Sequence, residues 1–309
     1  MAFKRISNWM ITDTGRAFSY YLAGGISAAT ILAHYLPNTL FLDKYQEVIQ
    51  LYKNGFSVPV SRELENRFQK VLELLEIDPI EKQLYKPFHV YGFDVLSAGS
   101  SYSKFGSIIG LPINFTYSNP NTIDKSKMKI NDESIVWDSE AAQNLLNSLV
   151  ISENGQLYAI AREIKYRQSP KPILDTFLSV NTVLMVYGIS KQINEKFNFY
   201  AKPLGLRLAL YSIVGVFGFG FYAMATDVSQ VYYEGQIDKE LKEKSELFID
   251  GGKEYYSKLL ERNKALRYLL GKEGERLYSV LGNDNYLLRQ KHIPLVQRKT
   301  HFEEYTATV

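Results

Sequence analysis

The sequence has 309 residues, of which 46% are hydrophobic and 22% are charged. Such a composition is typical of a folded protein and excludes a disordered or low-complexity chain. The net charge is only +3, so we expect no nucleic-acid partner, because a dedicated nucleic-acid binder needs a strongly basic surface. The sequence has no Cys, which excludes disulfides, thiolate metal sites and cysteine nucleophiles, and its four His are scattered, so we expect no metal site and no cofactor.

The apolar residues are concentrated in three stretches, at residues 17–36, 172–190 and 208–226. As a helix, each stretch would reach about 30 Å, which is enough to cross the hydrocarbon core of a bilayer. We therefore predict three transmembrane helices. The alternative, a buried helix of a soluble core, is stronger for the first two stretches, which are more polar than the third. Asp175 lies near the start of the second stretch, where we expect an interfacial acid rather than a functional carboxylate within the membrane.

The distribution of basic residues predicts the orientation. Residues 1–16 and the connector 191–207 carry more Lys and Arg than Asp and Glu, whereas residues 37–171 and 227–309 are close to balance. Short loops with a Lys and Arg excess stay on the inner side of a membrane. Both short basic segments are thus predicted on one side, and both long polar segments on the other side, where they can fold together as one domain.

The polar segments contain both helical and strand patterns. Helical spacing of apolar residues predicts helices over 61–77, from Asp138, from the N-cap Ser152 to about Arg167, over 236–248 and over 252–270. Residues 87–96 and 107–117 are rich in β-branched and aromatic residues, which predicts strands of a small antiparallel sheet. We expect an extended chain after Gly282. The predicted fold class is an α+β membrane protein, with three transmembrane helices and one mixed domain of helices and antiparallel sheet.

Several short motifs resemble a known family. The strongest is residues 253–283, followed by Lys291-His292-Ile293-Pro294, and the others are Tyr85-Lys86-Pro87-Phe88, Ser97-Ala98-Gly99, Gly110-Leu111-Pro112 and Ala161-Arg162-Glu163. In this order and spacing, the chain resembles the transmembrane protein 177 family over roughly residues 15–300.

The resemblance implies a location and a function. Members of the family belong to the inner mitochondrial membrane. There they bind and stabilise assembly intermediates of cytochrome c oxidase subunit 2, together with cytochrome c oxidase assembly factor 20, and no enzymatic activity is attributed to them. Combined with the charge distribution, this implies an N-terminus in the matrix and a main polar domain in the intermembrane space. A general membrane scaffold without specificity for the oxidase is one alternative.

A second likeness concerns residues 145–166, which resemble the zinc helix of membrane metallopeptidases of the CAAX-protease and Oma type. In their H-E-x-x-H motif, two His bind zinc and the Glu activates water. Here the corresponding positions are Arg162, Glu163 and Tyr166, so both ligand positions are changed, and Arg cannot lose its proton to become a ligand.

Glu240 follows the two later apolar stretches, where such enzymes supply their third ligand. If the domain is a degenerate metallopeptidase, we predict that Arg162 pairs with Glu240 in place of the metal. The alternative is an amphipathic surface helix with a solvated charged face. The matching alternative function is a membrane-bound metallopeptidase-like protein with residual or no activity.

Overall fold

The computed structural model describes residues 5, 8–125, 128–130 and 133–304, so residues 1–4 and 6–7 of the predicted N-terminal segment lie outside the described residues. The chain forms two compact units. The first consists of the residues up to Leu36 and of Pro170–Ser229. The second consists of Pro37–Ser169 and of the chain from Gln230 onward.

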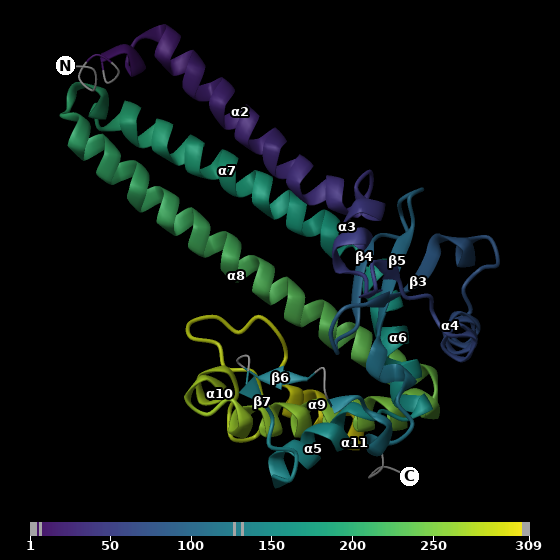
Figure 1. Ribbon diagram of the computed structural model, residues 1–309. Coiled ribbons are helices and arrows are strands. Elements are labelled where there is room, and N and C mark those ends of the chain that lie inside the picture. Colours follow the sequence, from purple (N-terminus) through teal and green to yellow (C-terminus); the bar gives the residue numbers. More distant parts are fainter. Residues whose placement is uncertain (1–4, 6–7, 126–127, 131–132, 305–309) are drawn as a thin grey trace. The chain divides into compact units, whose positions relative to one another are not determined.

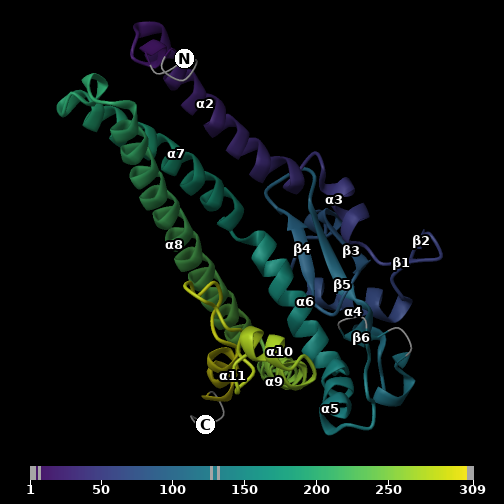
Figure 2. The same cartoon turned by 60° about the vertical axis from the view of Figure 1, so that its left-hand side comes forward.

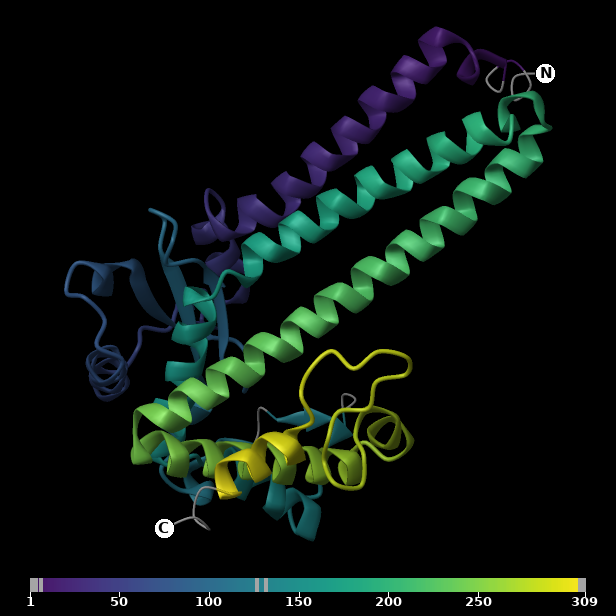
Figure 3. The same cartoon turned by 180° about the vertical axis from the view of Figure 1, so that it is seen from behind.

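The described part of the first unit is built mainly from long helices. These are α2 (Asp13–Tyr35), α7 (Lys171–Lys196) and the first part of α8 (Leu204–Lys244), with the short 3-10 helix η6 (Phe199–Ala201) between α7 and α8. Helices α2 and α7 pack side by side, as Figures 1 and 3 show. The side chain of Thr12 begins α2 by accepting a hydrogen bond from the Gly15 amide.

Two helices of the described residues, not three, are long and apolar enough to cross a membrane. They are α7 and α8, whose most apolar 18-residue windows have mean hydropathies of 1.4 and 1.8. The prediction of three transmembrane helices is therefore wrong in its number. Helix α2 has the necessary length, with 23 residues, but its serines, tyrosines and His34 lower its hydropathy.

Helix α8 is much longer than predicted. It continues for 41 residues without interruption, whereas the sequence suggested an apolar helix over 208–226 and a separate one over 236–248. No proline interrupts residues 204–244, so nothing in the backbone forces a break. Its length of about 61 Å is roughly twice the thickness of a hydrocarbon core. The part beyond Ser229 accordingly belongs to the second unit.

The sheet of the second unit has three strands, β3 (Tyr85–Val90), β4 (Leu96–Gly99) and β5 (Ser107–Pro112), in the order β3-β5-β4. The predicted antiparallel sheet is corrected to a mixed one, because β5 runs antiparallel to β4 but parallel to β3. Gly99 and Gly106 both have positive φ, of 88° and 72°, and turn the chain between β4 and β5. Strand β4 thereby takes one edge of β5 and leaves the other edge to β3.

The helices of the second unit mostly follow the predictions. Helix α4 (Arg62–Leu74) is capped by Ser61, α5 (Glu140–Leu149) by Ser139 and α6 (Glu153–Gln168) by Ser152. Helix α9 (Glu246–Leu269) is followed by α10 (Lys272–Leu277) and, after a long loop, by α11 (Leu295–Glu303), which lies along α9 (Figure 3). The expectation of an extended chain after Gly282 is wrong for this last helix.

Other elements of the described chain are short: α3 (Leu42–Ile49), β1 (Tyr52–Lys53), β2 (Phe56–Ser57), β6 (Lys129–Ile130), β7 (Glu133–Ser134), and the 3-10 helices η1 (Leu36–Asn38), η2 (Glu81–Leu84), η3 (Ile113–Thr116) and η4 (Pro120–Thr122). The main core lies between α4, α6, α9 and the fully buried strand β5. Figure 2 shows the sheet beside α6, in agreement with the contacts that α6 makes to β4 and β5.

Candidate functional site

The candidate site surrounds helix α6, which is held closely against α9. A side chain at Gly251 of α9 would come within 2.3 Å of the Asn154 carbonyl oxygen, so only glycine allows this approach. The Ser152 amide donates to Glu254 of α9, with an N–O distance of 2.9 Å, at the N-terminus of α6. These contacts fix the position from which α6 presents its polar side chains.

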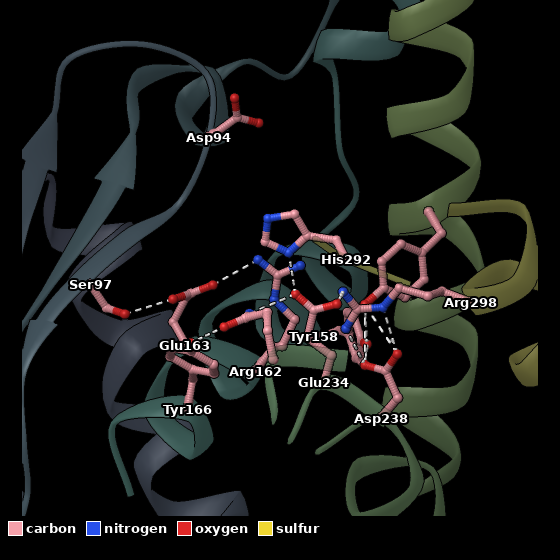
Figure 4. A network of polar contacts seen from close by, with 12 residues as sticks. Asp94, Ser97, Tyr158, Arg162, Glu163, Tyr166, Glu234, Asp238, His292 and Arg298 are labelled. Atoms are coloured by element: carbon pink, nitrogen blue, oxygen red, sulfur yellow. Dashed lines mark hydrogen bonds and ion pairs between the residues drawn. The ribbon is translucent and has the colours of Figure 1, made fainter. Parts of the chain in front are cut away.

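On one side of α6, Glu163 connects the helix to the sheet. Its carboxylate accepts a hydrogen bond from the Ser97 hydroxyl of β4 at 2.6 Å and another from the Arg162 guanidinium at 2.7 Å (Figure 4). Arg162 also lies over the ring of Tyr255 from α9, 5.5 Å from its centroid. The Arg162–Glu163 ion pair is mostly shielded from solvent, and its contacts join α6 to β4 and α9.

On the other side, Tyr166 begins a chain of hydrogen bonds to α8. Its hydroxyl donates to the Gln230 side chain at 2.5 Å, and the Gln230 amide donates to Glu234 at 2.8 Å. Glu234 also binds the loop before α11, because His292 Nδ1 lies 2.5 Å from one of its oxygens and the Ile293 amide donates to the other at 3.0 Å.

These partners set the charge state of Glu234. Burial alone would raise the pKa of its carboxyl group. The hydrogen bond from His292 and the nearby charge of Arg298 outweigh this effect and lower the pKa to about 2. Glu234 is therefore a carboxylate, and not a proton donor, at any physiological pH.

One turn further along α8, Asp238 lies at the centre of a buried cluster (Figure 4). Arg298 of α11 donates two hydrogen bonds to its two oxygens, each 2.7 Å long. The hydroxyls of Tyr158 and Tyr256 donate to the same carboxylate at 2.7 and 3.1 Å. Arg298 also stacks over the Tyr256 ring, 4.7 Å from its centroid, so its charge is matched from two directions.

Comparison with known proteins identifies the family. The sequence profile described as "Transmembrane protein 177" matches residues 38–301, which include every member of this network. The proteins named "Transmembrane protein 177" from Xenopus laevis, Mus musculus and Homo sapiens are each 30% identical to this chain. The matches cover 89%, 92% and 89% of this chain and 88%, 90% and 87% of those proteins, respectively. The chain belongs to the transmembrane protein 177 family. No solved structure matches it.

Family membership confirms the resemblance expected from the sequence motifs, and the structure shows where the four predicted site residues lie. Arg162, Glu163 and Tyr166 come together on α6, each with a partner from the protein. Glu240 is instead half-exposed on α8 and forms an ion pair with Lys165. Among the ion pairs of the described residues, the predicted pair of Arg162 with Glu240 is replaced by Arg162 with Glu163 and Lys165 with Glu240.

The network of this family member is suited to hold elements together. In the part of the chain that the structure describes, no group of three or more His, Asp or Glu side chains is placed to hold a metal ion. The carboxylates of Glu234 and Asp238 are matched by the Arg298 guanidinium, which supplies the positive charge at this position. Their contacts join α6, α8, α9 and α11 through buried hydrogen bonds.

The sequence analysis missed the centre of this network. Glu234 and Asp238 are four residues apart and share one face of a helix, which is the available signal. Their main partner, Arg298, follows 60 residues after Asp238, in a segment that was expected to be extended. Helical spacing cannot predict a contact over that distance, because it depends on how α11 packs against α9.

Proposed function

We propose that this family member is a membrane-anchored binding protein without catalytic activity. It binds an assembly intermediate of cytochrome c oxidase subunit 2 in the inner mitochondrial membrane and stabilises this intermediate together with cytochrome c oxidase assembly factor 20. A protein that binds only the folded form of a partner stabilises it by mass action. The oxidase partners come from the family resemblance, whereas the binding surface is argued from the structure.

The observation that carries the proposal is an apolar surface loop, residues 278–288, between α10 and α11. Leu287 and Leu288 are 96% and 90% exposed, and Val280 and Leu281 in the same loop are also exposed. Contiguous apolar side chains at a surface are typical of protein or membrane contacts. We assign this loop as the contact surface for the partner.

The base of this loop is held in place by the core. Asn263 of α9 is buried and donates a hydrogen bond to the Gly282 carbonyl at 2.9 Å. Gly282 has a φ of 89°, and a side chain there would lie 2.5 Å from the Leu260 carbonyl oxygen. A loop held in this way loses little conformational entropy when a partner binds, which favours affinity.

The orientation in the membrane follows from charge. Helices α7 and α8 form a hairpin, and the connector between them, residues 197–203, lies in a basic part of the chain. We place this connector in the matrix and the second unit in the intermembrane space. Arg16, near the start of α2, lies 4.6 Å from the ring centroid of Tyr200 in the connector, so α2 begins beside this connector.

Affinity purification from mitochondria under mild detergent tests the proposal. We expect the tagged protein to retain newly made subunit 2, and the variant Leu287→Ser/Leu288→Ser to lose most of it. The matched control is Ile80→Ser/Val136→Ser, which removes two exposed apolar side chains elsewhere in the second unit and should retain subunit 2. Equal recovery from both double variants would contradict the assignment of the loop.

The metallopeptidase alternative is distinguished by metal content. We expect the purified protein to contain no stoichiometric zinc, because Arg162 and Tyr166 stand at the ligand positions and are bound to other groups. One equivalent of zinc that is lost in Glu163→Gln would favour the enzyme instead. Failure to retain subunit 2, with another membrane protein recovered in its place, would favour a general scaffold.

A further inference from the structure

The first unit contains a large open groove bounded by α2, α7 and α8. Its volume is about 1100 Å³, above the roughly 300–1,000 Å³ of a typical small-molecule pocket. At one side, α8 closely approaches the lining residue Val186 of α7, because a side chain at Gly218 would come within 2.3 Å of it. Tyr20 of α2 contacts Tyr187 of α7 and fixes another wall, with 6.3 Å between the ring centroids.

Most of the groove is apolar. Its walls include Ala23, Ile26, Val183, Leu208 and Phe219, and it extends along α8 as far as Tyr222. From Arg207 to Tyr222, the helix rises about 22 Å. The hydrocarbon part of one lipid leaflet is half of the roughly 30 Å core, about 15 Å deep, and the helix segment is longer than this. The groove is thus long enough to take an acyl chain along its full depth in one leaflet.

One end of the groove is basic. Arg16, Lys191 and Arg207 line it, with Glu195 as the acidic residue of the same lining. Arg207 is only 4% exposed, although it lies at the start of an apolar helix. Arg16 is held in position by its stacking on Tyr200. Three cations and one acid leave this end with a net positive charge, which is complementary to an anion.

A buried amide at the same end has unused hydrogen-bonding capacity. Asn194 lines the groove and is 2% exposed, and its Nδ2 donates to the Tyr211 hydroxyl at 2.9 Å. Its Oδ1 is buried and has no hydrogen-bond partner among the residues that the structure describes. A buried amide oxygen without a partner is costly, so a ligand with a hydroxyl donor is favoured there.

We propose that this groove binds one anionic phospholipid. Its phosphate lies between Arg16, Lys191 and Arg207, a glycerol hydroxyl of its headgroup donates to Asn194, and its acyl chains fill the apolar part. Basic pockets between membrane helices are known to bind anionic headgroups in this way. The proposal concerns the first unit alone and is independent of the apolar loop and of the oxidase partner.

Native mass spectrometry of the full-length protein in mild detergent tests the proposal. The protein is given equal amounts of phosphatidylglycerol and phosphatidylcholine with the same acyl chains, and glycerol phosphate in a separate arm. Each interfacial cation contributes about a fivefold preference for an anionic lipid. We expect one bound phosphatidylglycerol, and a preference that falls by roughly 25-fold in Arg16→Gln/Arg207→Gln. Lys202→Gln is the matched control, because Lys202 is exposed and does not line the groove.

A second variant keeps all charges and tests the proposal even if Arg16→Gln/Arg207→Gln fails to fold. Gly215 lines the groove with open space beyond its Cα, so Gly215→Leu fills the apolar part without a clash and should lose the bound lipid. Gly220→Leu, at an equally open position that does not line the groove, should keep it. Equal retention of both lipids, lipid retained in Gly215→Leu, or displacement of the lipid by glycerol phosphate would each overturn the proposal.

Discussion

Asp238 and Arg298 form a buried, two-pronged ion pair, with Oδ2–Nε and Oδ1–Nη2 distances of 2.7 Å each. The two side chains are 3% and 5% exposed, and they come from helices α8 and α11. Two parallel hydrogen bonds fix the relative orientation of their side chains as well as their distance. The pair therefore sets the position of α11, whose preceding loop carries the exposed leucines 287 and 288.

We predict that Arg298→Met destabilises the protein by about 3–5 kcal/mol, because it leaves the buried Asp238 charge without a partner. Adding Asp238→Asn should recover part of this loss, since the charge is then removed while the two tyrosines keep an acceptor. The measurement is the free energy of unfolding in detergent for both single variants and the double variant. Additive effects would show that the two side chains do not act as a pair.

Acid should destabilise the protein through Glu234. Its pKa is about 2 in the folded protein, against an ordinary value of 4.5. The stabilisation is therefore complete above pH 4.5 and is lost as the pH falls toward 2. Its full size is roughly 3 kcal/mol, an upper value for a carboxylate that is 9% exposed. Melting temperatures between pH 2 and 6, measured by circular dichroism, should fall more steeply for the wild type than for Glu234→Gln.

The matched control for the acid experiment is Glu240→Gln. Glu240 lies on the same helix, but it is 55% exposed and its ion pair with Lys165 is screened by solvent. Its pH profile should follow that of the wild type. A profile of Glu234→Gln that also follows the wild type would mean that another group carries the acid dependence.

Gly251 offers a test of how α6 is positioned. Gly251→Ala should destabilise the protein by about 1–3 kcal/mol, because the new methyl group overlaps the Asn154 carbonyl of α6 and the helices must separate. Gly220→Ala, in open space on α8, should be neutral or stabilising by up to about 1 kcal/mol. The melting temperature in detergent should therefore fall for Gly251→Ala and stay the same or rise for Gly220→Ala. A Gly251→Ala variant as stable as the wild type would contradict the close approach.

Sequence patterns predicted the local structure well where one residue type decides it. Ser152 was expected to begin a helix and does so, because its side chain accepts from the Gly155 amide. The apolar spacing of residues 61–77 likewise corresponds to α4. The position of β4 was missed, because its four residues are too few to show a strand pattern. The parallel pairing of β3 and β5 follows from that missed strand.

Contacts between distant segments were beyond the reach of periodicity. Arg162 and Glu240 were paired by analogy with a metal site, but the register of α6 against α8 places Lys165 against Glu240 instead. Tyr166 reaches α8 at Gln230, 64 residues away. Such pairings depend on helix lengths and crossing points, and α8 proved to continue well beyond its apolar part. Side-chain partners could therefore be predicted only if the residue at which α8 ends were known.

The final prediction concerns sidedness. If α7 and α8 form a membrane hairpin, a tag inserted after Lys202 and a tag at the C-terminus must lie on opposite sides. Because the connector is basic, we expect protease added to mitoplasts to remove the C-terminal tag and to leave the connector tag until detergent is added. The reverse pattern would invert the orientation and place the apolar loop in the matrix. Removal of both tags in intact mitoplasts would show that the hairpin does not cross the membrane, because the two tags would then share one compartment.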